Sequence, residues 1–306
     1  MKSKLTTTTA SADGLLLVDK PAGLSSHDVV AVARRALGEK RIGHGGTLDP
    51  FATGLLVLLL GRATRLLRFV PLEPKLYEAT VRFGSETDTE DLTGTITAEA
   101  PRPRVSELIE AAQLLVGTIA QTPPAFSAKR VDGSRAYKLA RRGQAPVLAP
   151  VSVRVYSLVC TPCEVADDGT VDRATLLVSC GSGTYIRSLA RDLARSVGSV
   201  AHLEALRRTR LGPYKIDDAA TMDDLAGGRA RLRPAVDALE GYPRQLLSSD
   251  EVSRVSRGID VAATVPGALA ALTTALDGGE VLVSLGERRT GETGDRWQPR
   301  VVMRES

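Results

Sequence analysis

The sequence predicts an α+β fold of about two domains, and three observations support this expectation. At 306 residues the chain is long for a single hydrophobic core. Segments with strand and helix patterns follow one another along most of the chain. Past Asp237, Gly-rich turns separate short apolar runs, which indicates a small β-rich region. The 43% hydrophobic and 25% charged fractions are typical of a soluble globular protein, so fibrous and disordered classes are excluded.

The first elements are predicted by local signals. Residues 14–18 form a short apolar strand, and a turn follows it. Ser25 is a helix N-cap, with Asp28 three residues later as a weak capping box. The helical spacing of apolar residues then continues until Gly38 ends the helix. A Gly-rich loop leads to the apolar run at 55–60, which predicts a buried segment.

The middle of the chain alternates between the two periodicities. Residues 77–83 alternate like a strand, and 151–159 and 174–179 are further strand candidates. Helices are expected at 105–116 and 184–197. The second of these helices has one apolar face, and we expect its arginines on the outside.

Composition divides the chain into regions. Residues 1–12 form a polar, Thr-rich tail, and 13–240 form the main domain. Within it, the stretch 121–150 is Pro-rich at both ends and strongly basic in the middle, which indicates an inserted element. Residues 246–306 are expected to form the small β-rich domain.

Charge and apolar content limit the class of partner. The net charge is +4, and basic residues gather in short clusters along the chain. A single cluster is typical of a solvated helix face, but so many are compatible with a surface that follows phosphates. The longest apolar run is far too short to cross a membrane. We therefore expect a cytoplasmic protein without a membrane partner.

Neither a metal site nor a cofactor is predicted. Three cysteines cannot build a disulfide framework, and the pair in Cys160-Thr-Pro-Cys163 has no second pair. The three histidines are scattered and do not complete a zinc spacing. The Gly-rich loop lacks the Gly-Lys-Ser/Thr of a phosphate-binding P-loop.

Asp49 is the candidate catalytic residue. An Asp-Pro dipeptide alone is usually a turn or a helix cap. Here, however, Gly43, Gly45 and Gly46 precede it and let a backbone approach a bulky ligand, and His44 has no apolar neighbours in sequence to bury it. A single carboxylate on such a loop suits nucleophilic or acid–base chemistry.

Five segments in order resemble one family. Residues 43–54, Gly-His-Gly-Gly-Thr-Leu-Asp-Pro-Phe-Ala-Thr-Gly, resemble the signature loop of the TruB family of tRNA pseudouridine synthases. The other four segments are 17–26, 75–91, 121–129 and 183–208. Together they span about residues 15–213, which is most of the chain. Gly45 departs from the family, which more often has Thr or Ala there.

The resemblance implies a fold and an activity. The fold is a large mixed, mainly antiparallel sheet flanked by helices, with a small PUA-like C-terminal domain. The activity is conversion of a specific uridine in the T-loop of tRNA, position 55, to pseudouridine by base flipping. The enzyme is implied to need no cofactor or metal and no obligatory protein partner, and to act as a monomer on the tRNA T-arm.

The resemblance also implies residue roles. Asp49 is the nucleophile, Arg187 pairs with it, and Tyr185 exchanges protons with the base. Tyr77 stacks on the uracil and Leu206 forms a wall of the pocket. Without the family, Tyr77 and Leu206 would be read as core residues and Arg187 as an exposed helix residue.

Five further residues are implied to support the loop or bind RNA. His44 inserts where the target base leaves the RNA, and Lys20 supports the active-site loop. Lys129, Arg141 and Arg142 on the basic insertion contact the RNA.

Two alternatives use the same scaffold. One is a non-catalytic tRNA-binding or folding helper, which would not need Asp49, Tyr77, Tyr185 and Arg187 together. The other is a guide-RNA-dependent relative, against which the long basic insertion favours a stand-alone enzyme.

Overall fold

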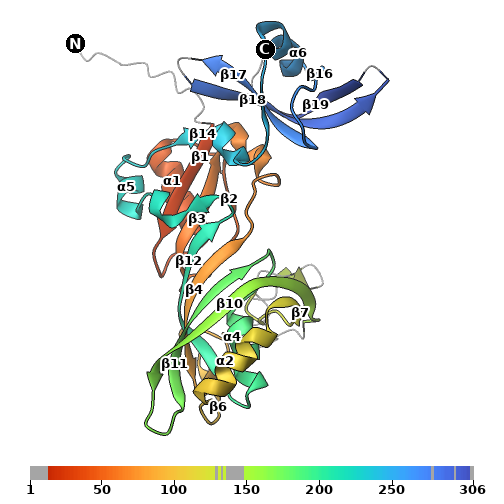
Figure 1. Ribbon diagram of the computed structural model, residues 1–306. Coiled ribbons are helices and arrows are strands. Elements are labelled where there is room, and N and C mark those ends of the chain that lie inside the picture. The colour runs from red at the N-terminus through yellow and green to blue at the C-terminus, as the bar shows by residue number, and fades with distance from the viewer. Residues whose placement is uncertain are drawn as a thin grey trace, which may run out of the picture.

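The computed structural model describes residues 13–127, 130–131, 134–135, 148–276, 279–292 and 294–303. Figure 1 shows an elongated molecule with a small C-terminal sheet at one end. The predicted tail at 1–12 and the predicted RNA contacts Lys129, Arg141 and Arg142 lie outside the described residues. In the part of the chain that is described, no helix is long and apolar enough to span a membrane.

A ten-stranded sheet forms the centre of the molecule. Its main path is β14 (Arg233–Pro234), β1 (Gly14–Lys20), β3 (Thr53–Leu60), β12 (Ala201–Leu211), β4 (Lys75–Phe83), β11 (Val171–Cys180), β10 (Val151–Val165) and β7 (Gly117–Gln121). In addition, β2 (Ile42–Gly45) pairs with β3, and β13 (Tyr214–Lys215) pairs with β12. Only the short β12–β3 pairing is parallel among these. The predicted mixed, mainly antiparallel sheet is confirmed.

The first helix follows its predicted caps closely. Helix α1 (Ser26–Leu37) has Ser25 as N-cap, and its capping box with Asp28 is complete. It ends at Gly38, whose φ of 65° is the left-handed conformation that favours glycine. It packs Val29 and Ala33 against the apolar faces of β1 and β3.

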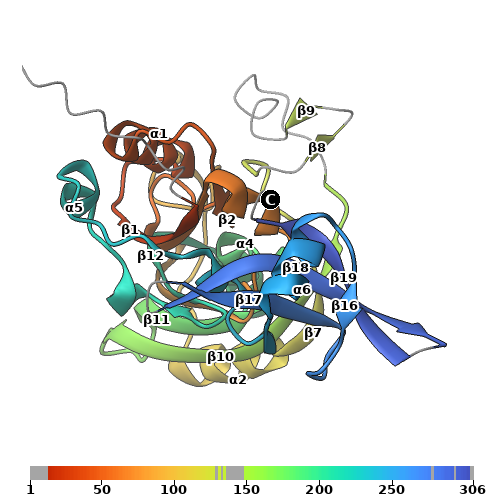
Figure 2. The ribbon, with the colours of Figure 1, turned by 90° about the horizontal axis from the view of Figure 1, so that it is seen from above.

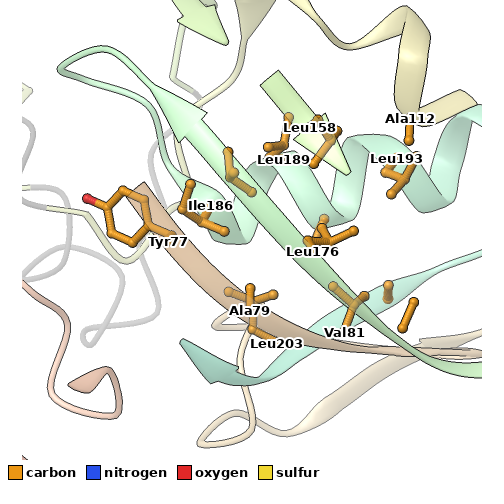
Figure 3. Packing of buried hydrophobic residues seen from close by; sticks show 14 of the residues in the cluster. Tyr77, Ala79, Val81, Ala112, Leu158, Leu176, Ile186, Leu189, Leu193 and Leu203 are labelled. Carbon is orange, nitrogen blue, oxygen red and sulfur yellow. The ribbon is translucent and has the colours of Figure 1, made fainter. Parts of the chain in front are cut away.

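Helices α2 (Val105–Leu114) and α4 (Ile186–Ser196) cover the other half of the sheet. Figures 1 and 2 show α1 and the short α5 (Met222–Ala226) beside β1, well away from α2. Helix α4 buries Ile186, Leu189 and Leu193 against strands β4, β11 and β12, as Figure 3 shows. This core fixes the position of the helix that carries the predicted Arg187.

The expectation that the arginines of this second helix lie outside is wrong for two of them. Arg187 and Arg191 are only 3% and 7% exposed, whereas Arg195 is exposed. Helical periodicity identifies the apolar face, but it does not reveal what covers the opposite face. Here that face is covered by the segments 88–94 and 121–127, whose carbonyl and carboxylate oxygens receive the guanidinium groups.

Short elements connect the larger ones. They are the 3₁₀ helices η1 (Gly61–Leu66), η2 (Ile216–Asp218) and η3 (Ala235–Leu239), and the strand pairs β5 (Ser85–Thr87) with β6 (Ile96–Glu99) and β8 (Arg130–Val131) with β9 (Ser134–Arg135). The segment 88–94 is the turn between β5 and β6, so that hairpin places it against α4.

The C-terminal region contains a five-stranded sheet. Its order is β15 (Arg244–Leu246), β17 (Leu269–Leu276), β18 (Gly279–Gly291), β19 (Gly294–Val302) and β16 (Val261–Ala262), and α6 (Ser249–Ser256) packs on it. The predicted β-rich region is therefore present. Its apolar residues Leu282, Leu285 and Val301 belong to one core cluster with Leu15 and Val57 of the main sheet. The two sheets share this core, and the exact domain boundaries stay a prediction.

Candidate active site

Lys20 holds the end of the Asp49 loop. The loop runs from β2 to β3, and Lys20 at the end of β1 lies completely buried beneath it. Its ammonium group donates to the carbonyl oxygens of Pro21 at 2.9 Å, Leu24 at 2.7 Å and Pro50 at 3.3 Å. Burial lowers the pKa of Lys20 to about 8, which leaves the group charged at neutral pH. These contacts join the end of β1 to the Asp49 loop, and the supporting role of Lys20 stays a prediction.

Arg208 holds the beginning of the same loop. Its guanidinium donates to the carbonyl oxygens of Gly46 at 2.9 Å, Thr47 at 3.4 Å and Leu55 at 2.9 Å, and it is almost fully buried. No role is predicted for Arg208 from the sequence. Arg208 shares one face of β12 with the core residue Leu206, but this is evident only once the strand is known, because arginines follow Leu206 on both faces.

A glycine explains how the loop returns to the sheet. Gly54 has a φ of 107°, and a Cβ atom there would lie 2.3 Å from the carbonyl oxygen of Arg208. Only glycine permits this close approach of β3 to β12. The glycine that ends the signature loop is thus required by the parallel pairing of Gly54 with Arg208.

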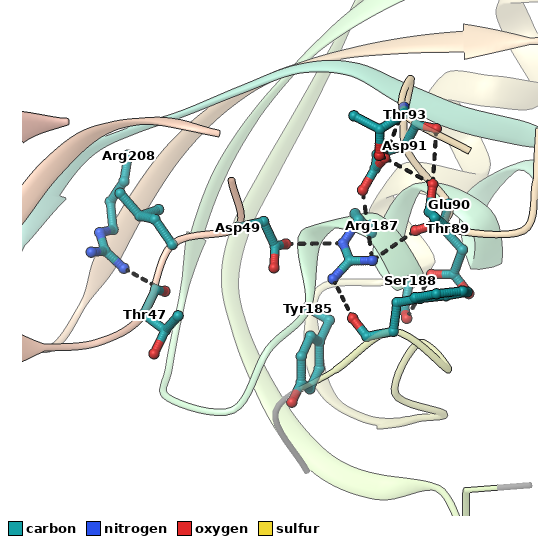
Figure 4. A network of polar contacts seen from close by, with 12 residues as sticks. Thr47, Asp49, Thr89, Glu90, Asp91, Thr93, Tyr185, Arg187, Ser188 and Arg208 are labelled. Carbon is teal, nitrogen blue, oxygen red and sulfur yellow. Dashed lines mark hydrogen bonds and ion pairs between the residues drawn. The ribbon is translucent and has the colours of Figure 1, made fainter. Parts of the chain in front are cut away.

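Asp49 and Arg187 meet directly. The Nε atom of Arg187 donates to Oδ2 of Asp49 at 3.0 Å, as Figure 4 shows. The same guanidinium donates to the carbonyl oxygens of Thr89 at 2.7 Å and Phe126 at 2.9 Å, and the Asp91 carboxylate lies 3.7 Å away. Asp49 is 36% exposed while Arg187 is 3% exposed. A fixed, buried cation therefore orients a carboxylate that solvent can reach.

Tyr185 precedes helix α4 and lies close to this pair, as Figure 4 shows. Its backbone is fixed by Gln121, whose amide oxygen accepts from the Tyr185 N–H at 2.8 Å and whose amide nitrogen donates to the Tyr185 carbonyl at 3.1 Å. Burial raises the pKa of the Tyr185 hydroxyl, and the charge of Asp49 raises it further. At neutral pH this hydroxyl is a proton donor.

Tyr77 and Leu206 belong to the apolar core next to the loop. Both are buried in one cluster with Leu48 of the loop and Ile186 of α4. Figure 3 shows Tyr77 at the end of this cluster, with its hydroxyl pointing away from the aliphatic side chains. Burial raises the pKa of that hydroxyl. The location suits a pocket wall and equally suits a core residue, so the roles of both residues stay predictions.

His44 lies in β2, at the start of the loop. It is half-buried, and its ring makes an edge-to-face contact with His27 of α1, with 5.5 Å between ring centroids. Burial lowers the pKa of His44, and the neighbouring His27 and Arg208 act in the same direction. The ring is therefore neutral at neutral pH, which is the form that stacks on a base without attracting phosphate.

A pocket of about 430 Å³ lies beside the loop but does not include Asp49. Asp19, Lys20, Thr53 and Arg207 are among its lining residues. Asp19 and Arg207 form an ion pair at 2.7 Å across this region. The pocket therefore carries little free charge from these two residues, and it is distinct from the Asp49–Arg187 pair.

Solved structures share this architecture. The structure of an H/ACA RNP bound to a substrate RNA containing 2′-deoxyuridine superposes with a TM-score of 0.69 at 24% identity, covering 96% of this chain and 86% of that chain. The archaeal box H/ACA sRNP Nop10–Cbf5 complex gives a TM-score of 0.68 at 24% identity, with 96% and 87% covered. At this identity the likeness establishes the fold.

Sequence relatives are closer. The tRNA pseudouridine synthase B of Thermobifida fusca (strain YX) is 46% identical over 251 residues, which cover 81% of this chain and 86% of the relative. That of Mycobacteroides abscessus is 41% identical over 298 residues, covering 96% and 97%. The family profile for the N-terminal domain of TruB family pseudouridylate synthases matches residues 34–186, and that for the C-terminal domain of tRNA pseudouridylate synthase B matches 187–248. The chain belongs to the TruB family of pseudouridylate synthases and is an enzyme of that family.

Proposed function

We propose that this enzyme converts uridine 55 in the T-loop of tRNA to pseudouridine, with Asp49 as its nucleophile. The observation that carries the proposal is the 3.0 Å contact between the Asp49 carboxylate and the buried Arg187 guanidinium. Arg187 engages Oδ2, and among the described residues Oδ1 accepts no hydrogen bond. An exposed carboxylate oxygen held in a fixed direction suits attack on a flipped nucleotide.

The reaction is an isomerisation. Attack by Asp49 forms a bond to the nucleotide and leads to cleavage of the bond between N1 of uracil and C1′ of the ribose. The uracil turns, a bond forms between its C5 and C1′, the bond to Asp49 breaks and restores the carboxylate, the proton on C5 leaves, and N1 gains a proton. No atom or electron is gained overall, so the chemistry requires neither a redox cofactor nor a metal.

The surrounding residues fit the demands of this sequence. Detached uracil must stay in the site while it turns, and Tyr77 and Leu206 would provide an aromatic face and an apolar wall. The Tyr185 hydroxyl, protonated at neutral pH, would exchange a proton with the base. Lys20 and Arg208 would keep the Asp49 loop from moving while the nucleotide reacts.

The enzyme would act alone on tRNA in the cytoplasm. The relatives that cover most of this chain are called tRNA pseudouridine synthase B, which supports tRNA as the substrate. The basic insertion, with Lys129, Arg141 and Arg142, would bind the T-arm without a guide RNA or a protein partner, and a monomer would suffice.

A non-catalytic tRNA-binding or folding helper is the alternative. A protein that only binds RNA gains nothing from burying a cation against a loop carboxylate. Desolvating Arg187 is costly, and contact with Asp49 and three further oxygens compensates for it. The arrangement therefore favours catalysis.

Tritium release from tRNA carrying 5-tritiated uridine tests the proposal, since the C5 proton leaves only if the isomerisation occurs. We expect Asp49→Asn to abolish release while tRNA affinity changes by less than about tenfold, or about 1.4 kcal/mol. Asp250→Asn on α6, an exposed aspartate far from the loop in sequence, is the matched control and should retain full activity. Single-turnover product from Asp49→Asn, with wild-type contamination excluded, would refute the nucleophile assignment.

A further inference from the structure

A second buried arginine follows Arg187 on helix α4. Arg191 donates one guanidinium nitrogen to the Glu90 carboxylate and the other to the Thr122 carbonyl oxygen at 2.9 Å. Asp192 accepts from its Nε atom at 2.9 Å. Glu90 and Arg191 lie inside two of the five segments that resemble the family, at 75–91 and 183–208, but the resemblance implies no role for either residue.

Arg187 and Arg191 bridge the same two segments. Residues four apart lie on one side of a helix, so the two guanidinium groups point in similar directions. Arg187 donates to Thr89 in the segment 88–94 and to Phe126 in the segment 121–127. Arg191 donates to Glu90 and Thr122 of those same segments. The second bridge therefore joins the same two segments that provide the carbonyl groups on which the first depends.

Glu90 is conformationally unusual. It has a φ of 61°, and it is the one non-glycine residue with positive φ in the described part of the chain. Side chains rarely adopt this conformation, and it persists where other contacts hold it. Its carboxylate accepts from Ser188 of α4 at 3.0 Å as well as from Arg191, and Figure 4 shows it beside Ser188. Both contacts tie the strained residue to α4.

The neighbours of Glu90 in sequence explain why this matters. Thr89 provides the carbonyl oxygen that accepts from Arg187, and Asp91 provides the carboxylate 3.7 Å from it. Anchoring Glu90 therefore fixes both groups at once. Burial raises the pKa of Glu90, and the positive charge of Arg191 opposes this shift. The ionised form of the Glu90 carboxylate is therefore stabilised by its contact with Arg191.

We propose that Glu90 and Arg191 are positioning residues for the Asp49–Arg187 pair. Together they hold the Thr89 and Phe126 carbonyl oxygens where these orient the Arg187 guanidinium toward Asp49. Both side chains are buried, at 8% and 7% exposed, so the role is one of positioning and not of contact with the nucleotide. This inference rests on the proposed function, because its effect is on the rate of the Asp49-dependent step.

Single-turnover kinetics with excess enzyme over 5-tritiated tRNA tests the proposal. We expect Arg191→Met and Glu90→Gly each to slow the rate constant by about tenfold or more, because small misplacements of reacting groups have effects of this size. The dissociation constant for tRNA should change less than about twofold, well under 1 kcal/mol. The double variant should be no slower than the slower single variant, because both changes remove the same bridge.

Arg195→Met is the matched control. Arg195 is one turn further along α4 and pairs with Glu86 at 2.9 Å, but it is exposed and touches neither carbonyl that Arg187 uses. Its replacement should leave the rate constant unchanged. Arg191→Lys retains the charge and should restore part of the lost rate.

Several outcomes would overturn the inference. If Glu90 and Arg191 only stabilise the fold, their variants would have a lower melting temperature and a smaller amplitude of product formation, but the folded fraction would react with the normal rate constant. If Glu90 only forms the turn, Glu90→Gly, which suits a φ of 61°, would leave the rate constant unchanged. If the wild-type enzyme forms no product, both the proposed function and this inference are wrong. If the wild-type enzyme turns over normally and the variants are unimpaired, only this inference is wrong.

Discussion

Arginine side chains near Asp49 are held differently from those of the C-terminal sheet. Arg187 and Arg208 are buried and donate mainly to backbone carbonyl oxygens, which cannot move independently of the fold. Arg288, Arg296 and Arg300 are less buried, and each pairs with an acidic side chain of the same region, although Arg288 and Arg296 also donate to backbone carbonyl oxygens. A buried arginine with backbone partners determines the geometry of its neighbours, whereas a surface pair is weak and easily replaced by water. This difference gives the two regions different expected responses to substitution.

The largest effect is expected at Arg187. Arg187→Ala should lower the single-turnover rate by about a hundredfold or more, about 2.7 kcal/mol, because Asp49 loses the group that orients it. Affinity for tRNA should change little, since a side chain that is 3% exposed cannot reach a phosphate. Filter binding and tritium release measure the two quantities separately. Reduced affinity at an unchanged rate would show that Arg187 contacts RNA instead.

The next effect concerns stability and the shared core. Leu285 of β18 is fully buried in the cluster that also contains residues of β1 and β3. Leu285→Ala should lower the free energy of unfolding by about 2–5 kcal/mol. Thermal unfolding monitored by circular dichroism should remain a single transition, because the two sheets lose the same core together. A separate early transition for the C-terminal region would show that the two regions unfold independently.

Local signals in the sequence were sufficient for some elements but not for others. Helix α1 was predicted with its caps, because Ser25, Asp28 and Gly38 each act within a few residues. Strand β12 was not predicted, because the arginines that follow Leu206 obscure its alternation. Its parallel pairing with β3 also joins residues that are distant in sequence, and no local pattern reports such a pairing.

The candidate site was likewise predicted from the sequence only in part. The glycines before Asp49 marked the loop, but the partnership with Arg187 followed only from the family resemblance. Arg187 lies 138 positions from Asp49, and a helix pattern by itself places such an arginine outside. The buried positions of Arg191 and Arg208 were not predicted for the same physical reason. The oxygens that accept hydrogen bonds from these two arginines belong to segments that are distant in sequence and pack against them only in the fold.

An intermediate effect is expected for the basic insertion, whose Arg141 and Arg142 lie outside the described residues. Replacing both with alanine should weaken tRNA binding and leave the single-turnover rate at saturation unchanged, the reverse of Arg187→Ala. A plot of log affinity against log salt concentration has a negative slope, and the steepness of this slope should decrease by about one unit for each lost phosphate contact. Titrations at several salt concentrations measure this slope. An unchanged slope would remove both arginines from the RNA interface.

The smallest effect is expected in the C-terminal sheet. We expect a domain of this kind to extend the RNA-binding surface beyond the T-arm. Truncation near Leu246 does not test this cleanly, because it would also expose the shared core around Leu285. Weaker binding by the truncated chain could then result either from lost RNA contacts or from lost stability. Point variants avoid this problem. Arg300 is paired with Glu287 at 3.2 Å, so Arg300→Ala should change stability by less than about 1 kcal/mol and tRNA affinity hardly at all.

Arg289 is the informative counterpart of Arg300. It lies on β18, next to the strand β19 that carries Arg300, is exposed, and has no ion pair within the described residues. If the C-terminal sheet binds RNA, Arg289→Ala should weaken binding of full-length tRNA by a few-fold, under about 1.4 kcal/mol, and leave binding of a short T-arm hairpin unchanged. Because the hairpin lacks the distant parts of tRNA, an equal loss for hairpin and tRNA would place Arg289 at the T-arm. No loss for either substrate, together with the expected destabilisation by Leu285→Ala, would indicate that this sheet serves to stabilise the catalytic core.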